Sequence, residues 1–304
     1  MKPINILRLL TSICLLSICI SFQGCIDDDL SVCGINLRFT YTQNVDGVDK
    51  YNESVERISL FVFDTSDTFI GEYTQENTNN MNLNLMPGVY SLIAWGNLDE
   101  SYTLSSFVPN ETKLKDALLS LTRANDTITN YPTDLYHGAL MNVEIQPDVQ
   151  NNQSQTIDMI KNTKNISVTS VGLPITTRSS ADDFICKITS INGDYNFDNS
   201  IAGDSRLHYI QDSEINENAH LKSKFVTMRE LEDRSTDSRL IITHTEDSST
   251  KEIFNESLVG LLLPATITGN LDIEDTFDIL IEFTAGRITI TVNGWLIKDS
   301  GRPV

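Results

Sequence analysis

Short alternations of apolar and polar residues, separated by turn residues, recur along most of the chain and constrain its fold more than any other feature. Ile35, Leu37 and Phe39 are separated by polar residues, which is the period of a strand with one buried face. The denser run VERISLFVFD, Val55–Asp64, is rich in β-branched and aromatic residues. Many short strands with regular turns predict antiparallel β-sandwiches rather than a parallel α/β sheet.

Turn and helix signals refine this prediction. Pro87-Gly88, Asn192-Gly193 and Asn293-Gly294 each stand between two strand-like segments and are typical of tight turns, so we expect hairpins there. Thr112–Arg123 carries leucines at helical spacing and is the one helix expected in the first half.

A polar stretch near the middle, NNQS at residues 151–154, is typical of a linker. The expected domains are therefore an amino-terminal β-sandwich over residues 35–148 and a carboxyl-terminal β-sandwich over residues 149–304. Trp95 and Trp295 both lie in strand-like contexts, which favours packing in the core for each.

The amino terminus has the layout of a bacterial lipoprotein signal. Lys2 and Arg8 precede an apolar run from residue 9 to residue 22, which is too short for a comfortable membrane span, and Gly24 then stands directly before Cys25. We predict a signal peptide over residues 1–24, acylation (palmitate among the chains) at Cys25, and a lipidated acidic tether over residues 25–34. The alternative is an ordinary secreted protein in which Cys25 pairs with another thiol.

The acidic residues decide which partners are excluded. The formal net charge is −20, and the signal segment carries two basic residues and no acidic one, which leaves −22 for the rest. Nucleic acids and anionic lipids bind cationic surfaces, so neither is expected as a partner. Asp27, Asp28 and Asp29, directly after Cys25, form a charged spacer.

Two cysteines remain outside the signal and the acylation site. Cys33 and Cys186 would mature in an oxidising compartment, so a disulfide between them is one interpretation. Two free buried thiols are the other, because spacing alone gives no geometry.

A search for reactive residues finds little. No histidine pair has metalloprotease spacing, and no CxxC pair, GxSxG turn or phosphate-binding glycine loop is present. Asp194, Asn196 and Asp198 resemble the start of a calcium-binding loop, but Asn199 and Ser205 stand where that loop needs Gly and Glu. We therefore expect polar outward positions of a strand there, no cofactor, no metal site and no enzyme activity.

Several blocks, in order along the chain, resemble the fimbrial anchor lipoproteins of the FimB/Mfa family of Bacteroidales. The most specific are the lipidated start CIDDDLSVCGINLRFTYT and the turn-strand block LMPGVYSLIAWGNLD. The others are VERISLFVFD, DLYHG, KNTKNISV, INGDYNFDN, FVTMREL and ITITVNGW, which together cover nearly the whole mature chain.

The resemblance implies two tandem transthyretin-like β-sandwich domains and a protein fixed in the outer membrane. Such a protein holds the base of a fimbrium on the cell surface, influences its length, binds pilin subunits and serves adhesion. It also implies that Asp27, Asp28 and Asp29 act as a surface-export signal. The main alternative is a surface glycan-binding lipoprotein, which would display clustered exposed aromatics, and a surface hydrolase is a third reading.

An anchor of this kind needs a surface that holds a pilin. An open sheet edge can do so by strand addition, and the carboxyl-terminal segment Ile288–Ile297 is our candidate edge because it is apolar, alternating and close to the end of the chain.

Overall fold

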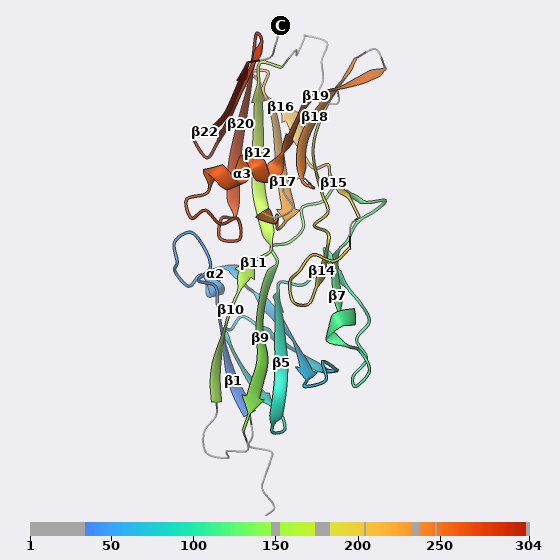
Figure 1. Ribbon diagram of the computed structural model, residues 1–304, viewed down its shortest axis with the longest axis vertical. Coiled ribbons are helices and arrows are strands. Elements are labelled where there is room, and N and C mark those ends of the chain that lie inside the picture. Colours follow the sequence, from blue (N-terminus) through green and yellow to red (C-terminus); the bar gives the residue numbers. More distant parts are fainter. Residues whose placement is uncertain are drawn as a thin grey trace, which may run out of the picture.

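The computed structural model describes residues 34–146, 153–173, 183–203, 205–232, 237–246 and 248–301. The described chain is built almost wholly of β-strands with a few short helical turns, which confirms the all-β prediction. Two sets of strands lie end to end along the longest axis of the molecule, and the chain passes from one to the other through β10, β11 and β12 (Figure 1).

The first set contains a small sheet and a larger one. The three-stranded sheet consists, in order, of β10 (Gln153–Asp158), β1 (Gly34–Thr40) and β4 (Asn80–Asn84). The five-stranded sheet consists, in order, of β11 (Ile160–Lys161), β9 (Tyr136–Ile145), β5 (Gly88–Gly96), β2 (Arg57–Asp64) and β3 (Phe69–Glu76). The short helix α2 (Tyr51–Ser54) lies between β1 and β2 in the chain.

The second set is a pair of larger sheets. The six-stranded sheet consists, in order, of β16 (Ser213–Ile215), β17 (Leu221–Met228), β12 (Thr163–Val171), β20 (Thr276–Thr284), β21 (Arg287–Val292) and β22 (Trp295–Gly301). The five-stranded sheet consists, in order, of β19 (Ser249–Ser257), β18 (Arg239–Glu246), β13 (Phe184–Ser190), β15 (Leu207–Tyr209) and β8 (Thr127–Ile128). Helix α3 (Leu258–Leu262) and the 3₁₀ turn η5 (Leu263–Ala265) follow β19.

A third small sheet explains the dense apolar run in β2. It consists, in order, of β14 (Asp194–Asn196), β7 (Leu118–Leu121) and β6 (Tyr102–Leu104). One face of β2 places Ile58 and Leu60 in the core under β1, while the other face places Phe61 and Phe63 in a second core that extends into the other set of strands. A strand with both faces buried has continuous apolar residues instead of alternating ones.

The predicted helix at Thr112–Arg123 is wrong. The segment forms a 3₁₀ turn, η2 (Leu114–Asp116), followed by β7, which pairs with β6 on one side and with β14 on the other. Leu119 and Leu121 are buried with period two, so tertiary pairing overrides the helical spacing of the leucines.

The two sets of strands share elements, so the expected division at residues 148 and 149 does not describe them. β10 and β11 come after that division but pair with β1 and β9 of the first set. β8 of the first half joins a sheet of the second set, and β14 of the second half joins β7. The chain passes from the first set to the second at about residue 162, between β11 and β12.

One of the three predicted hairpins is confirmed. Asn293 and Gly294 have positive φ angles of 49° and 81° and join β21 to β22 as direct partners. Pro87-Gly88 instead connects β4 to β5, which belong to different sheets, and Asn192-Gly193 connects β13 to β14, which also belong to different sheets. Three of the strand pairs, β1–β10, β12–β20 and β15–β8, are parallel, whereas antiparallel sheets were expected.

Candidate functional site

The strand that follows the predicted tether starts at one extreme of the molecule. β1 runs parallel to β10, whose carboxyl end continues into the second set of strands. Tyr41, directly after β1, reaches the second set, where its hydroxyl donates to Asp275 Oδ2 at 2.5 Å. Gly34 therefore lies at the end of the first set that is farthest from the second set. Cys25, Asp27, Asp28 and Asp29 lie outside the described residues, so their predicted roles stay predictions.

The predicted disulfide stays untested, and the described residues give it no support. Cys33 lies outside them, while Cys186 is a free cysteine buried in β13 of the second set. Burial raises the pKa of the Cys186 thiol to about 12.

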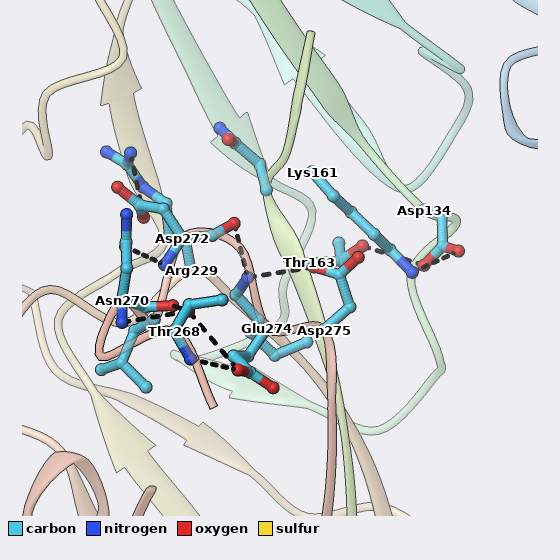
Figure 2. A network of polar contacts seen from close by, with 12 residues as sticks. Asp134, Lys161, Thr163, Arg229, Thr268, Asn270, Asp272, Glu274 and Asp275 are labelled. Carbon is cyan, nitrogen blue, oxygen red and sulfur yellow. Dashed lines mark hydrogen bonds and ion pairs between the residues drawn. The ribbon is translucent and has the colours of Figure 1, made fainter. Parts of the chain in front are cut away.

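The two sets of strands meet in a network of polar side chains (Figure 2). Asp134, which precedes β9, forms an ion pair of 2.7 Å with Lys161 and accepts a hydrogen bond of 2.9 Å from Thr163 Oγ1. In Figure 2 this group lies beside Asp272, Glu274 and Asp275, on the loop that leads into β20. Side chains from both sets are thus fixed to one another where the chain crosses between them.

Lys164 lies at the centre of this network. Its side chain is 1% exposed, and Nζ contacts Asp275 Oδ1 at 3.1 Å and the backbone carbonyl of Asp272 at 3.4 Å. Burial lowers the pKa of Lys164, and the neighbouring Asp275 carboxylate opposes that shift. Burial and the same carboxylate raise the pKa of the Tyr41 hydroxyl. An ion pair with a buried lysine, and with a tyrosine on the second oxygen of its carboxylate, fixes the two sets of strands to each other.

Arg229 adds further contacts to the joint, which is the region around Lys164 where the two sets of strands meet. Its Nη1 lies 3.4 Å from Asp272 Oδ1, and its Nη2 donates to the backbone carbonyl of Asn199 at 2.7 Å. Asn199 in turn contacts Asn162, the residue between β11 and β12. His137 of β9 is buried and contacts the backbone carbonyl of Phe197 at 3.0 Å, and burial lowers its pKa to about 4. These contacts connect the two sets of strands through several side chains of each.

In the segment that resembles the start of a calcium-binding loop, the carboxylates of Asp194 and Asp198 contact other groups of the protein. Asp194 forms a two-point ion pair with Arg123 at 2.8 and 2.9 Å, and the pKa of Asp194 is lowered by that hydrogen bond against the effect of burial. Asp198 accepts from the backbone and hydroxyl of Ser200. Over the described ranges, no group of three or more His, Cys, Asp or Glu side chains could hold a metal ion.

The six-stranded sheet of the second set offers an open edge, which begins at the junction end with Trp295. β22 pairs with β21 on one side and has no neighbouring strand on its other side among the described residues. Lys298 of β22 forms an ion pair of 2.6 Å with Glu256 of β19, the end strand of the five-stranded sheet, so the two sheet edges approach each other at this point. The candidate segment Ile288–Ile297 thus divides into β21, which is interior, and the beginning of β22, which is the edge.

The expected packing of the two tryptophans holds for one of them. Trp95 is fully buried in β5, whereas Trp295 is 63% exposed and the adjacent Leu296 is 62% exposed. The prediction for Trp295 is wrong because Trp295 begins β22, which is the last strand of its sheet within the described residues. Sequence alternation gave no sign of this, since an edge strand and an inner strand share the same period.

Exposed aromatic residues are not clustered. Within the described ranges they are Tyr131 and Trp295. Tyr131 follows β8, which ends its sheet at the side opposite β19, whereas Trp295 belongs to β22, which lies next to β19. The glycan-binding alternative expected such residues together on one face.

Among the described residues, no helix is both long and apolar enough to span a membrane.

The amino-acid sequence of this chain is similar to those of known fimbrial anchor proteins. Residues 30–301 match the family described as fimbrillin-A associated anchor proteins Mfa1 and Mfa2. The minor fimbrium anchoring subunit Mfa2 of Porphyromonas gingivalis is 26% identical over 227 residues, which cover 70% of this chain and 67% of that protein.

Two solved structures share the fold along nearly their whole length. The fimbrial anchor protein Mfa2 from Porphyromonas gingivalis superposes with a TM-score of 0.75 at 21% identity, covering 88% of this chain and 99% of that one. A Bacteroides thetaiotaomicron protein proposed to bind polysaccharide superposes with a TM-score of 0.75 at 26% identity, covering 87% and 97%. Since the family match spans most of the sequence, the chain belongs to the fimbrillin-A associated anchor proteins.

Proposed function

We propose that this protein is an outer-membrane lipoprotein that holds the base of a fimbrium on the cell surface and influences its length. Cys25 carries the lipid, and two or more acyl chains give stable anchoring where one alone is marginal. Asp27, Asp28 and Asp29 direct the protein to the outer face. The partner is a pilin subunit, and the protein has no catalytic role.

The family match is the observation that carries this proposal, and the two-ended geometry supports it. A tether that ends at Gly34 enters the molecule at one extreme, while the second set of strands projects away from that extreme. A joint of ion pairs, whose cations Lys164 and Arg229 are almost fully covered, connects the two, which suits a protein that must transmit a pull from fimbrium to membrane.

The pilin, in this proposal, adds a strand to the edge of β22. Main-chain hydrogen bonds to an open edge give affinity, and exposed apolar side chains beside the edge give specificity. Trp295 and Leu296 supply such side chains at the start of β22.

Replacement of the lipidated cysteine tests the tether. Cys25→Ala should leave the protein unacylated and release it from the membrane fraction, with the fold unchanged. Retention of the variant in the outer membrane after a high-salt wash would show that the lipid is not the anchor.

The acidic spacer is tested separately. Changing Asp27, Asp28 and Asp29 together to Ala should preserve acylation and reduce cleavage by protease added outside the cell. If protease access is unchanged, these residues are a plain spacer and the anchoring proposal still stands.

A single substitution in β22 tests whether the pilin pairs with this edge. In a two-residue hairpin the closing pair exchanges its hydrogen bonds, so Leu296, the next residue of β22, is expected to point its N–H to the open side. Leu296→Pro removes that donor without breaking the inner ladder, whereas a proline in β21 would break it. We expect Leu296→Pro to stay membrane-bound and to shed fimbriae, and Leu296→Thr, which keeps the N–H, to retain more of them. Fimbriae attached at normal length in Leu296→Pro would exclude this edge.

A further inference from the structure

β1 is the central strand of its sheet and is held along its whole length. It pairs with β10 from Ile35 to Thr40 and with β4 from Gly34 to Arg38. The inward side chains of Ile35, Leu37 and Phe39 are each no more than 1% exposed. Removing β1 would therefore break two ladders of main-chain hydrogen bonds and expose an apolar face at the same time.

The carboxyl end of β1 carries an additional lock. Asp158, the last residue of β10, accepts from Thr40 Oγ1 at 2.9 Å, from the backbone N–H of Thr42 at 2.9 Å and from Thr42 Oγ1 at 2.6 Å. The backbone N–H of Met159 donates to the carbonyl of Thr40 at 2.7 Å. One carboxylate thus fixes the end of β1 to the strand that continues into the second set.

The direction of these strands decides how a pull is carried. A pull from the tether acts on β1 at Gly34, and the opposing pull from the second set acts on β10 at Asp158, because β10 leads through β11 into β12. β1 and β10 are parallel, so the two forces slide one strand along the other. Both strands follow the long axis of the molecule (Figure 1).

We propose that β1 is the force-bearing strand of this protein and is loaded in shear against β10 and β4. In shear, every hydrogen bond of the ladders and the Asp158 lock resist together, whereas strands peeled from one end lose their bonds one pair at a time. Lifetime under force is set by the unfolding rate, so this arrangement lengthens the lifetime without raising equilibrium stability. The biological use of the strand rests on the proposed membrane tether, but its mechanical behaviour belongs to the folded chain alone.

Pulling on single molecules of the purified, lipid-free chain tests the proposal. In the shear geometry, one handle is attached at the amino end of the chain and the other at Glu100, an exposed residue at the junction end of the first set. In the peeling geometry, the second handle is at Ser154, an exposed residue of β10 that pairs with Asn36 near the start of β1. Click-reactive residues serve as handles, so the native cysteines stay untouched. We expect a rupture force several-fold higher in shear than in peeling, and equal forces would overturn the proposal.

A matched pair of variants locates the resistance. Asp158→Ala should lower the shear force and leave the first peeling peak unchanged, because the lock lies at the far end of the peeled strands. Asp64→Ala is the control: this carboxylate also accepts local hydrogen bonds, from the backbone N–H groups of Ser66 and Thr68, but in the turn between β2 and β3. It should change neither force.

If Asp158→Ala lowers both forces equally, the lock does not act along the strand and the proposal fails. Thr42→Val removes the Thr42 Oγ1 hydrogen bond alone and repeats the comparison if Asp158→Ala does not fold. Because these measurements use lipid-free protein, they are independent of whether Cys25→Ala leaves the membrane.

Discussion

Glu230 is a buried carboxyl group of the second set of strands. It lies directly beyond the end of β17 and Arg229, is 4% exposed, and belongs to none of the salt bridges of the described residues. Ser190 Oγ contacts Oε2 at 3.1 Å, and Asn192 Nδ2 donates to Oε1 at 2.9 Å. Burial raises the pKa of Glu230 from 4.5 to about 8, and neighbouring polar side chains together with the charge of Lys164 offset only part of that effect.

The sign of the effect on stability follows from this shift. The pKa is higher in the folded state, so the protonated carboxyl contributes stability that is fully present below pH 4.5 and is lost as the pH rises through about 8. At about 1.4 kcal/mol per pH unit, that window corresponds to about 5 kcal/mol. Glu230→Gln keeps the shape and mimics the neutral acid, since its amide can donate to Ser190 while its carbonyl accepts from Asn192.

We expect Glu230→Gln to lie within about 1 kcal/mol of the wild type near pH 4.5 and to be more stable by about 3 kcal/mol at pH 8. The expected gain of about 3 kcal/mol is smaller than the full window of about 5 kcal/mol because the amide is placed less well than the protonated carboxyl group. Urea unfolding between pH 4.5 and 8.5, followed by the fluorescence of the buried Trp95, measures the difference. Glu111→Gln, at an exposed position, controls for the loss of one negative charge from an acidic protein. If the unfolding free energy of Glu230→Gln changes with pH as that of the wild type does, or if the variant is less stable than the wild type at pH 8, the carboxyl group at this position is not neutral.

Three further predictions concern Lys164, Gly172 and Cys186. Lys164→Ala and Lys164→Met should each destabilise the protein by about 3 kcal/mol in urea unfolding, because each leaves the half-buried Asp275 carboxylate without its cation; a Lys164→Met variant as stable as the wild type would contradict the ion-pair argument. Gly172→Ala should cost at least about 1 kcal/mol by thermal unfolding, since its φ is +74° and a Cβ would lie 2.0 Å from the carbonyl oxygen of Phe283; an unchanged midpoint would contradict this. Cys186 should react with iodoacetamide, without prior reduction, only after unfolding, as mass spectrometry can show, and labelling of the folded protein would contradict its burial.

Local patterns predicted the strands well and their partners poorly. The alternation beginning at Ile35 became β1, and the run Val55–Asp64 became β2, because period and composition reflect which faces a strand buries. Partners depend on residues far away in the chain. The turn at Pro87-Gly88 has suitable residues for a hairpin, yet its strands β4 and β5 bury their apolar faces against each other from different sheets.

The candidate site shows the same division. The segment of interest near the carboxyl end and its hairpin at Asn293-Gly294 could be predicted from turn chemistry. The exposure of Trp295 could not, because it depends on the order of strands in the six-stranded sheet. The joint around Lys164 was also missed. A lysine in a strand gives no sign that its partner, Asp275, lies more than a hundred residues later.

The two halves of β22 differ in a way that bears on how an edge strand could serve as a docking surface. Its carboxyl half carries features that protect sheet edges: a register shift opposite Ile290, the charged side chain of Lys298, and the ion pair between Asp299 and Arg287. Its amino half carries none of these and instead exposes Trp295 and Leu296 next to each other.

An exposed apolar edge promotes aggregation unless something covers it, so a protein that protects half of a strand and leaves the other half open has a use for the open half. We therefore expect a partner strand to pair with β22 over Trp295–Ile297 and to stop before Lys298. Trp295→Ser should then weaken pilin retention more than Lys298→Ala, and the reverse order would place the contact on the protected half.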